Sequence, residues 1–386
     1  MNKLIFLLFA GLAIAAIPAG RLKGIGRSAE GIVKEVSSTK KIVHPGIDQY
    51  IKSMVDTANF QGVVLVVKGD KLIHKSVYGY SNRATKQPIQ IATQYLLGSL
   101  TKSFVSVAVM QLVETGKLTL LAPVSTYLPE LNTSLAKGLT IHHLLKHQSG
   151  LSLNLDAVTK YQLAELTPGE LLDLINQTKR RHEAGNVFEV SALNFMLLGM
   201  IIERVSKQSY ESYMQDHLFR PLRLKHTGIA NLFVLPKNKA NGYRLINGTI
   251  RRIEDIVSYG FATADMYSSV DDLFTWGYAL QHGLLVGSES RQLLFNGGVK
   301  EEGNYGYGFR TQAYLGSDST ETPGKLIRHG GVMNGFCANY HYYDKDDMTI
   351  IILNNYRNLK LLDITFKIKE LVYGYKPGQR KNKYHE

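Results

Sequence analysis

The chain of 386 residues is long enough for one large domain or two of ordinary size. A content of 44% hydrophobic and 20% charged residues is that of a globular protein and excludes a largely disordered chain. The single cysteine, Cys337, excludes an intramolecular disulfide and any cysteine-based zinc or redox site, and most of the formal charge of +13 gathers in two terminal segments.

The N-terminus has the pattern of an export signal. Lys3 supplies a positive charge, an apolar stretch follows as far as Ala16, and small residues around Pro18 form a typical cleavage site. The apolar stretch is short for a membrane span of ~20 residues. We therefore expect residues 1–19 to be a signal peptide and the protein to be exported, periplasmic or secreted, with retention as a membrane anchor as the alternative.

Two basic segments flank the remainder of the chain. Residues 20–44 are predicted to be a basic linker and residues 377–386 a basic tail. Such ends could lie on anionic lipid or on a cell-wall polymer, although a solvated flank is the simpler interpretation. Nucleic acid is not an expected partner of an exported chain.

Residues 45–376 are predicted to form one domain of the α/β class (α+β type). Helical or strand periodicity marks both of its ends, and the two hairpin turns contain Gly69-Asp70 and residues 344–347. We expect an antiparallel sheet flanked by helices and completed by both chain ends, with a mostly helical middle subdomain over about residues 120–290. The predicted strands are 63–67, 72–78, 336–343 and 348–354, and the predicted helices include 47–59, 170–176, 195–205, 271–281 and 361–372.

A nucleophile and a base are suggested by Ser99 and Lys102, which are three residues apart at the start of an apolar helical stretch ending at Gly116. In a helix this spacing brings the lysine amine to the serine hydroxyl. A lysine desolvated by its surroundings can act as the base that a serine nucleophile needs. The pattern alone is weak, because it also occurs at Ser37, Ser38 and Ser134, so a serine that only caps the helix remains the alternative.

Several segments together resemble class C β-lactamases and the related DD-peptidases and esterases. They follow the order of that family from about residue 45 to residue 373, and they are 98–104, 141–151, 197–203, 266–273 and 329–331. The resemblance implies a β-lactamase/transpeptidase-like fold. It also implies Ser99 as the acylated nucleophile and Lys102 as its partner.

The resemblance assigns substrate binding to His329, Gly330, Gly331 and Val332, where the family has Lys-Thr-Gly or His-x-Gly. The backbone N–H groups of Ser99 and Val332 would then form an oxyanion hole. A histidine at position 329 supplies less positive charge than a lysine. This favours esterase or peptidase relatives over recognition of a β-lactam carboxylate.

The second family element, Tyr-x-Asn, is missing. Spacing from Gly185 and from Gly199 places its tyrosine at Val190 and its asparagine at Ala192. Neither side chain can transfer a proton or orient a substrate. The neighbouring Glu189 and Ser191 could substitute only if the backbone shifted by one residue.

Three interpretations of function follow. The first is an exported serine hydrolase, which forms a Ser99 acyl-enzyme on esters, D-amino-acid peptides or related amides with reduced activity. The second is a catalytically weak or dead relative that binds a cell-wall or peptide ligand. The third, a metal hydrolase using His143 and His147, is disfavoured because no HExxH pattern accompanies them, so neither metal nor cofactor is expected.

Overall fold

The computed structural model describes residues 27–38, 40–155, 166–231, 236, 238–254, 260–297, 304–316 and 323–374. The predicted signal peptide and the basic tail lie outside these residues. Within the described part of the chain, no helix is both long enough and apolar enough to span a bilayer.

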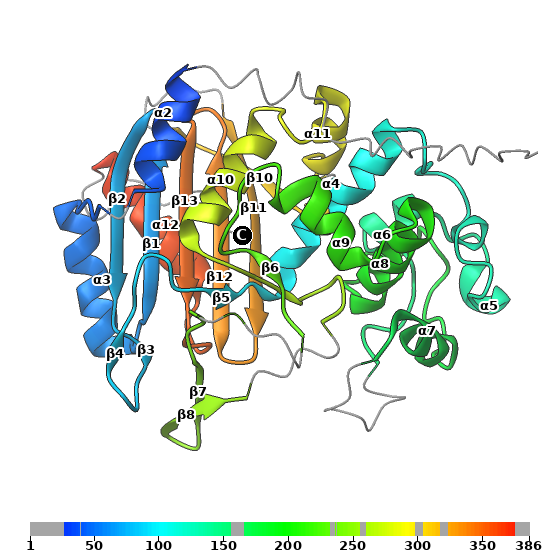
Figure 1. Cartoon of the computed structure of the whole chain (residues 1–386), viewed down its shortest axis with the longest axis horizontal. Coiled ribbons are helices and arrows are strands. Elements are labelled where there is room, and N and C mark those ends of the chain that lie inside the picture. The colour runs from blue at the N-terminus through cyan, green and yellow to red at the C-terminus, as the bar shows by residue number, and fades with distance from the viewer. Residues whose placement is uncertain are drawn as a thin grey trace, which may run out of the picture.

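A six-stranded antiparallel sheet, in the order β10-β11-β12-β13-β1-β2, forms the centre of the structure. Figure 1 shows that its strands come from both ends of the chain, as the sequence predicts. The N-terminal hairpin pairs with the last strand, for example Val64 opposite Ile352. The strands are β1 (Gly62–Lys68), β2 (Lys71–Tyr78), β10 (Arg310–Tyr314), β11 (Gly324–Met333), β12 (Phe336–Tyr343) and β13 (Met348–Asn354).

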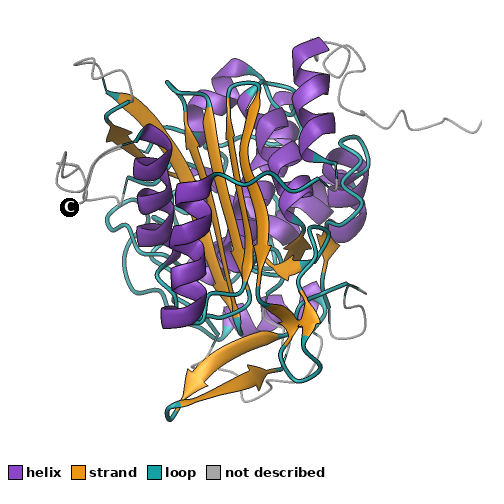
Figure 2. Cartoon of the chain, turned by 90° about the vertical axis from the view of Figure 1, so that its left-hand side faces the viewer, coloured by secondary structure: helices purple, strands orange, loops and turns teal. Residues whose placement is uncertain are grey.

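Helices cover both faces of this sheet. The helices α3 (Pro45–Ala58) and α12 (Leu361–Tyr373) lie side by side on one face, as Figure 2 shows. The opposite face carries α2 (Arg27–Val36), α4 (Thr101–Glu114) and α10 (Val270–Gln281). Because alternate residues of a strand point to opposite faces, Val64 and Val66 pack toward α3 and α12 while Val63 and Leu65 pack toward α4 and α10.

The middle of the chain is mostly helical, as expected, and lies beside the sheet (Figure 1). Its helices are α5 (Thr133–Ala136), α6 (Ile141–Leu145), α7 (Pro168–Asn176), α8 (Ala192–Ser206), α9 (Tyr210–Met214) and α11 (Ser288–Leu294), with short turns of other helix types at Val124–Thr126 and Gln215–Phe219.

Short strands join this helical part to the sheet. The pair β7 (Gly242–Ile246) and β8 (Thr249–Ile253) forms a projecting hairpin, and β3 (Tyr80–Asn82) pairs with β4 (Gln87–Pro88). A three-stranded ribbon consists of β5 (Tyr95–Leu96), β9 (Met266–Ser268) and β6 (Gly228–Ile229), and its strand β5 leads into the Ser99 turn.

The segment predicted to be a basic linker is partly ordered against the domain. It contains α2, in which Ile32 and Val36 are buried in the main core. The buried Nζ atom of Lys75 on β2 donates hydrogen bonds to the carbonyl oxygens of Val36 and Ser38 and to the Asp271 carboxylate. Lys75 therefore attaches the end of this helix to the sheet by hydrogen bonds, and attaches the sheet to α10 by an ion pair.

Candidate active site

Ser99 lies in a single 3₁₀ turn, η1 (Gly98–Leu100), and α4 begins two residues later at Thr101. Gly98 has φ of +55° and rests on the backbone of Val332, where a Cβ atom would approach to 2.8 Å. A residue with a side chain would be both strained and in collision here. Glycine therefore lets the serine turn sit directly against β11.

Lys102 is 4% exposed, and its Nζ atom lies 3.0 Å from Ser99 Oγ and 2.9 Å from the carbonyl oxygen of Thr263. Burial lowers the pKa of this amine to about 7, and the charge of Asp265 opposes the shift. A substantial fraction of Lys102 is consequently a free amine at neutral pH. Its lone pair can accept the Ser99 hydroxyl proton while one of its hydrogens remains bonded to Thr263.

The strand β11 forms the other wall of the site. Gly331 faces the Ser99 turn so closely that a Cβ atom would lie 1.8 Å from the carbonyl oxygen of Leu97. The next residue, Val332, is half exposed and pairs with Cys337 on β12. The backbone of Val332 thus borders the serine turn, and Gly330 faces Asn339 on the neighbouring strand.

His329 is buried, and its tautomer follows from its partners. Nδ1 lies 2.7 Å from the Gly330 carbonyl oxygen, which only accepts, so Nδ1 carries the proton. Nε2 is then an acceptor, and the hydroxyl of Tyr305 donates to it at 3.3 Å. Burial, with the nearby charge of Lys102, lowers the pKa of His329 to about 3, so this side chain is neutral.

The two positions at which the sequence predicts the tyrosine and asparagine of the family motif lie at the start of α8. Val190 is 46% exposed, and Ala192 is the first residue of the helix. Between them, Ser191 caps the helix: its Oγ accepts from the Leu193 N–H at 3.2 Å. Glu189 pairs with Arg181 at 3.2 Å. Both polar neighbours therefore have structural partners.

The two histidines of the metal hypothesis do not share a helix face. The helix α6 ends at Leu145, and His147 adopts a left-handed backbone with φ of +55°. Its Nδ1 atom lies 3.0 Å from the amide nitrogen of Asn194, whereas His143 Nδ1 accepts from the Thr140 N–H at 3.2 Å. No cluster of three or more His, Cys, Asp or Glu side chains suited to a metal ion occurs among the described residues.

The sequence patterns do not predict Thr263, Asp265 or Tyr305 as neighbours of the site. Thr263 contributes only its backbone oxygen, which no residue pattern reveals. An acidic residue in the otherwise weakly polar stretch 261–266 was the available signal for Asp265, which is buried.

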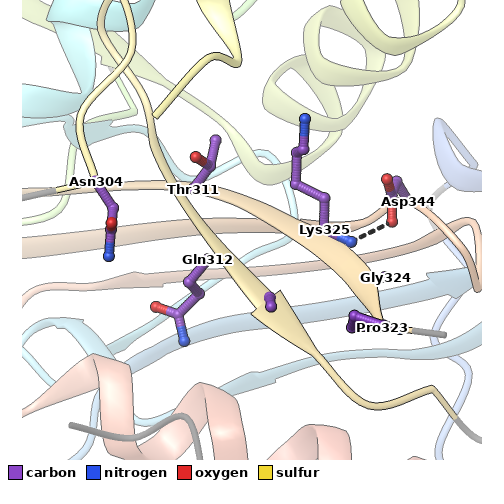
Figure 3. Close-up of a pocket in the computed structure, with 8 residues that line it drawn as sticks. Asn304, Thr311, Gln312, Pro323, Gly324, Lys325 and Asp344 are labelled. Atoms are coloured by element: carbon purple, nitrogen blue, oxygen red, sulfur yellow. Dashed lines mark hydrogen bonds between the residues drawn. The ribbon is translucent and has the colours of Figure 1, made fainter. Parts of the chain in front are cut away.

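A separate hollow of about 450 Å³ opens at the end of β10 and β11 (Figure 3). The Lys325 N–H donates to Asp344 Oδ1 at its rim, at 2.6 Å. None of the predicted site residues lines this hollow, and its walls are formed by Asn304, Thr311, Gln312, Ala313, Pro323, Gly324, Lys325 and Asp344.

The fold together with a buried lysine against a serine defines a serine-hydrolase scaffold. The model of the family described as Beta-lactamase matches residues 47–363. The chain therefore belongs to the beta-lactamase family, which confirms both the predicted resemblance and the predicted fold class.

Individual relatives agree with this assignment. The chain is 28% identical to "Putative penicillin-binding protein PbpX" of Bacillus subtilis over 91% of this chain and 82% of that protein. It is also 28% identical to Protein flp of Staphylococcus aureus over 80% of this chain, but spans only 62% of that protein's length. The solved octameric penicillin-binding protein homologue from Pyrococcus abyssi superposes with a TM-score of 0.75 and 25% identity, covering 86% of this chain and 78% of that one.

Proposed function

We propose that this protein is an exported serine hydrolase that forms an acyl-enzyme at Ser99 on esters, D-amino-acid peptides or related amides. The observation that carries the proposal is the 3.0 Å contact between Lys102 Nζ and Ser99 Oγ, with the pKa of the buried amine lowered to about 7. This is a nucleophile in hydrogen-bond reach of a base that is partly deprotonated at neutral pH.

In the proposed acylation step, Lys102 Nζ takes the proton of Ser99 as Oγ attacks the substrate carbonyl carbon. The carbonyl oxygen becomes an oxyanion, which the N–H groups of Ser99 and Val332 stabilise; one such donor contributes about 3 kcal/mol in well-studied hydrolases. The Lys102 ammonium then gives its proton to the leaving oxygen or nitrogen as the bond to the carbonyl carbon breaks. In deacylation, Lys102 takes a proton from a water molecule as the water attacks the acyl carbonyl carbon. Lys102 then returns the proton to Ser99 Oγ as the ester bond to the acyl group breaks.

Two features set the expected range of substrates. His329 is neutral, so this position adds no positive charge for a substrate carboxylate. Val190 and Ala192 replace the proton-transferring and amide-binding side chains of the family motif. General acid–base assistance is typically worth about 10²–10⁴-fold. We therefore propose slow turnover, with activated esters acylated faster than amides.

Incubation with a fluorescent penicillin or a fluorophosphonate, followed by mass measurement of the intact protein, tests the proposal. We expect one adduct on wild type, located to Ser99 by peptide mapping, and none on Ser99→Ala. The double variant Val190→Tyr, Ala192→Asn should label faster, because it restores the missing phenol and amide. An unlabelled wild type with a readily labelled double variant would instead support the second function, a catalytically weak or dead member that binds a cell-wall or peptide ligand.

The proposed location outside the cytoplasm rests on the N-terminal pattern of residues 1–19. The mass of the mature protein, purified from a cell that exports it, would show cleavage near residue 19. In that setting the basic ends at 20–44 and 377–386 could contact cell-wall polymer or a membrane surface. Recovery of the full-length protein in the cytoplasm would contradict this part of the proposal.

A further inference from the structure

The turn that contacts Lys102 is closed by a buried carboxylate. Thr263 supplies the carbonyl oxygen that accepts from Lys102 Nζ, and two residues later Asp265 Oδ2 accepts from the Ala262 N–H at 2.8 Å. Ala262 has φ of +54°, a left-handed conformation that a residue with a side chain seldom adopts. The Asp265 side chain therefore helps to hold this turn in its strained shape, together with the hydrogen bonds that the Thr263 and Ala264 N–H groups donate to the Gly260 carbonyl oxygen at 2.8 and 2.7 Å.

The same segment continues directly to the nucleophile. Met266, the residue after Asp265, begins β9, and its N–H donates to Thr101 Oγ1 at 3.2 Å. Its carbonyl oxygen accepts from the Leu97 N–H at 2.8 Å, just before the Ser99 turn. A displacement of Asp265 would thus be transmitted to both sides of Ser99.

Asp265 is 3% exposed, and its charge acts to raise the pKa of Lys102. Burial raises the pKa of Asp265 to about 7, while the Lys102 charge acts to lower it. The Tyr210 hydroxyl donates to the second oxygen of this carboxyl, Oδ1, at 3.5 Å. In this solvent-poor site the carboxylate favours the charged form of Lys102, against the cost of burying the amine.

The remaining groups around Lys102 carry little charge. Ser99 and the Thr263 carbonyl are its hydrogen-bond partners, and the Phe195 ring lies 5.7 Å from Nζ. His147 and His329 also sense the Lys102 charge, but burial depresses the pKa of both imidazoles. Among the described groups that act on the charge of Lys102, Asp265 is the acid.

We propose that Asp265 is a positioning residue for acylation. It fixes the Thr263 carbonyl against Lys102, and its carboxylate stabilises the ammonium that forms when Nζ takes the Ser99 proton. This inference rests on the proposed function. Without a phenol at position 190, Lys102 must both accept that proton and return it to the leaving group, so the stability of the buried ammonium limits the step.

The substitution Asp265→Asn removes the charge but leaves an amide oxygen that can still accept from the Ala262 N–H. We expect the acid limb of the kcat/KM profile to move down by about one pH unit, because an ammonium without its counter-charge loses its proton more readily. We also expect the plateau to fall about tenfold. A purely structural role would lower kcat/KM at every pH and leave the limb in place, which would overturn the proposal.

A matched control is Asp272→Asn on α10. Asp272 is also a buried carboxylate, and it accepts from the His226 N–H at 2.6 Å and from the Thr227 hydroxyl at 2.9 Å. The charge of Asp265 acts on the pKa of Lys102, whereas that of Asp272 does not. The control should melt at a reduced temperature but keep the acid limb at the wild-type pH.

A second measurement does not depend on turnover. The ¹³Cε signal of Lys102 in lysine-labelled protein, assigned by its absence in Lys102→Ala, should titrate near pH 7 in wild type and at lower pH in Asp265→Asn. If the Lys102 titration shifts in this way but the wild-type protein neither turns over substrate nor is labelled at Ser99, the proposed function is wrong. The effect of the Asp265 charge on Lys102 would still stand. Equal Lys102 titrations in wild type and Asp265→Asn would defeat the Asp265 proposal itself.

Discussion

The amine of Lys102 and the imidazole of His329 lie in one buried site, yet their titrations fall in different pH ranges. Burial lowers the pKa of Lys102 to about 7 and that of His329 to about 3. Desolvation disfavours the charged form of each group, so both are neutral above pH 7. Of these two groups, only the lysine changes its charge between pH 4 and pH 7.

This separation predicts a pH profile for kcat/KM with an uncharged ester in which His329 takes no part. Asp265, whose pKa burial raises to about 7, ionises in the same range as Lys102. Only the free amine of Lys102 can accept the Ser99 proton, so kcat/KM should rise about tenfold per pH unit up to about pH 7 and then level off. Stopped or continuous assays of ester hydrolysis across pH 5–9 measure this dependence of kcat/KM on pH. The variant His329→Gln should keep the limb at the same pH, because it removes a side chain that is already neutral. A second ionisation near pH 6 that disappears in His329→Gln would contradict the assignment.

Part of this site could be predicted from sequence because its chemistry is local. Ser99 and Lys102 are three residues apart, so helical geometry alone brings their side chains together. Thr263 is 161 residues from Lys102 and is brought to it by the fold. Asp265 acts through the backbone of that same turn. Such contacts depend on tertiary packing, which periodicity and spacing do not encode.

At the scale of helices and strands, periodic apolar patterns predicted the terminal hairpins and the longer helices well. The pattern failed where an element is short or held by a specific contact. The ribbon strands β5, β6 and β9 have two or three residues each, too few to show a period. His147 follows a helical pattern but leaves the helix, because its ring binds the start of α8.

The helix α2 is another element that the sequence did not predict, because the basic composition of residues 20–44 indicated a linker. Lys75 attaches it, with its Nζ 2.8 Å from the Ser38 carbonyl oxygen and 2.9 Å from Asp271 Oδ2. The lysine side chain is fully buried, and burial lowers its pKa. Two backbone carbonyls and one carboxylate would lose their donor together if this amine were removed.

We therefore predict that Lys75→Met lowers the free energy of unfolding by about 3 kcal/mol, because it leaves a mostly buried carboxylate unpaired. Urea denaturation measures the change. The double variant Lys75→Met, Asp271→Asn should lose less, since neither charge is then left alone. Lys71→Met on the same strand is the matched control and should change stability by less than about 0.5 kcal/mol, because Lys71 is exposed. Equal losses in the single and double variants would show that the ion pair is not the cause.

At the scale of the whole molecule, the sheet separates two hydrophobic cores. Ile368 on α12 belongs to the smaller core, with Val64 and Val66 of β1. Trp276 on α10 belongs to the larger core on the opposite face and stacks on Phe104, with ring centroids 4.0 Å apart. Each central strand contributes alternate side chains to both cores. Loss of packing in either core therefore destabilises the same hydrogen-bonded strands.

This arrangement predicts that the two cores unfold together. Ile368→Ala should create a cavity and cost about 2–5 kcal/mol, because the side chain is fully buried. Trp276 is the one tryptophan of the chain, so its fluorescence reports on the opposite core. In Ile368→Ala, we expect the urea midpoint measured by Trp276 fluorescence to fall by the same amount as the midpoint measured by far-ultraviolet circular dichroism. Lys367→Ala, one residue away on a partly exposed position, should leave both midpoints in place. A Trp276 midpoint that stays at the wild-type value in Ile368→Ala, while the circular dichroism transition splits, would mean that the faces of the sheet unfold independently.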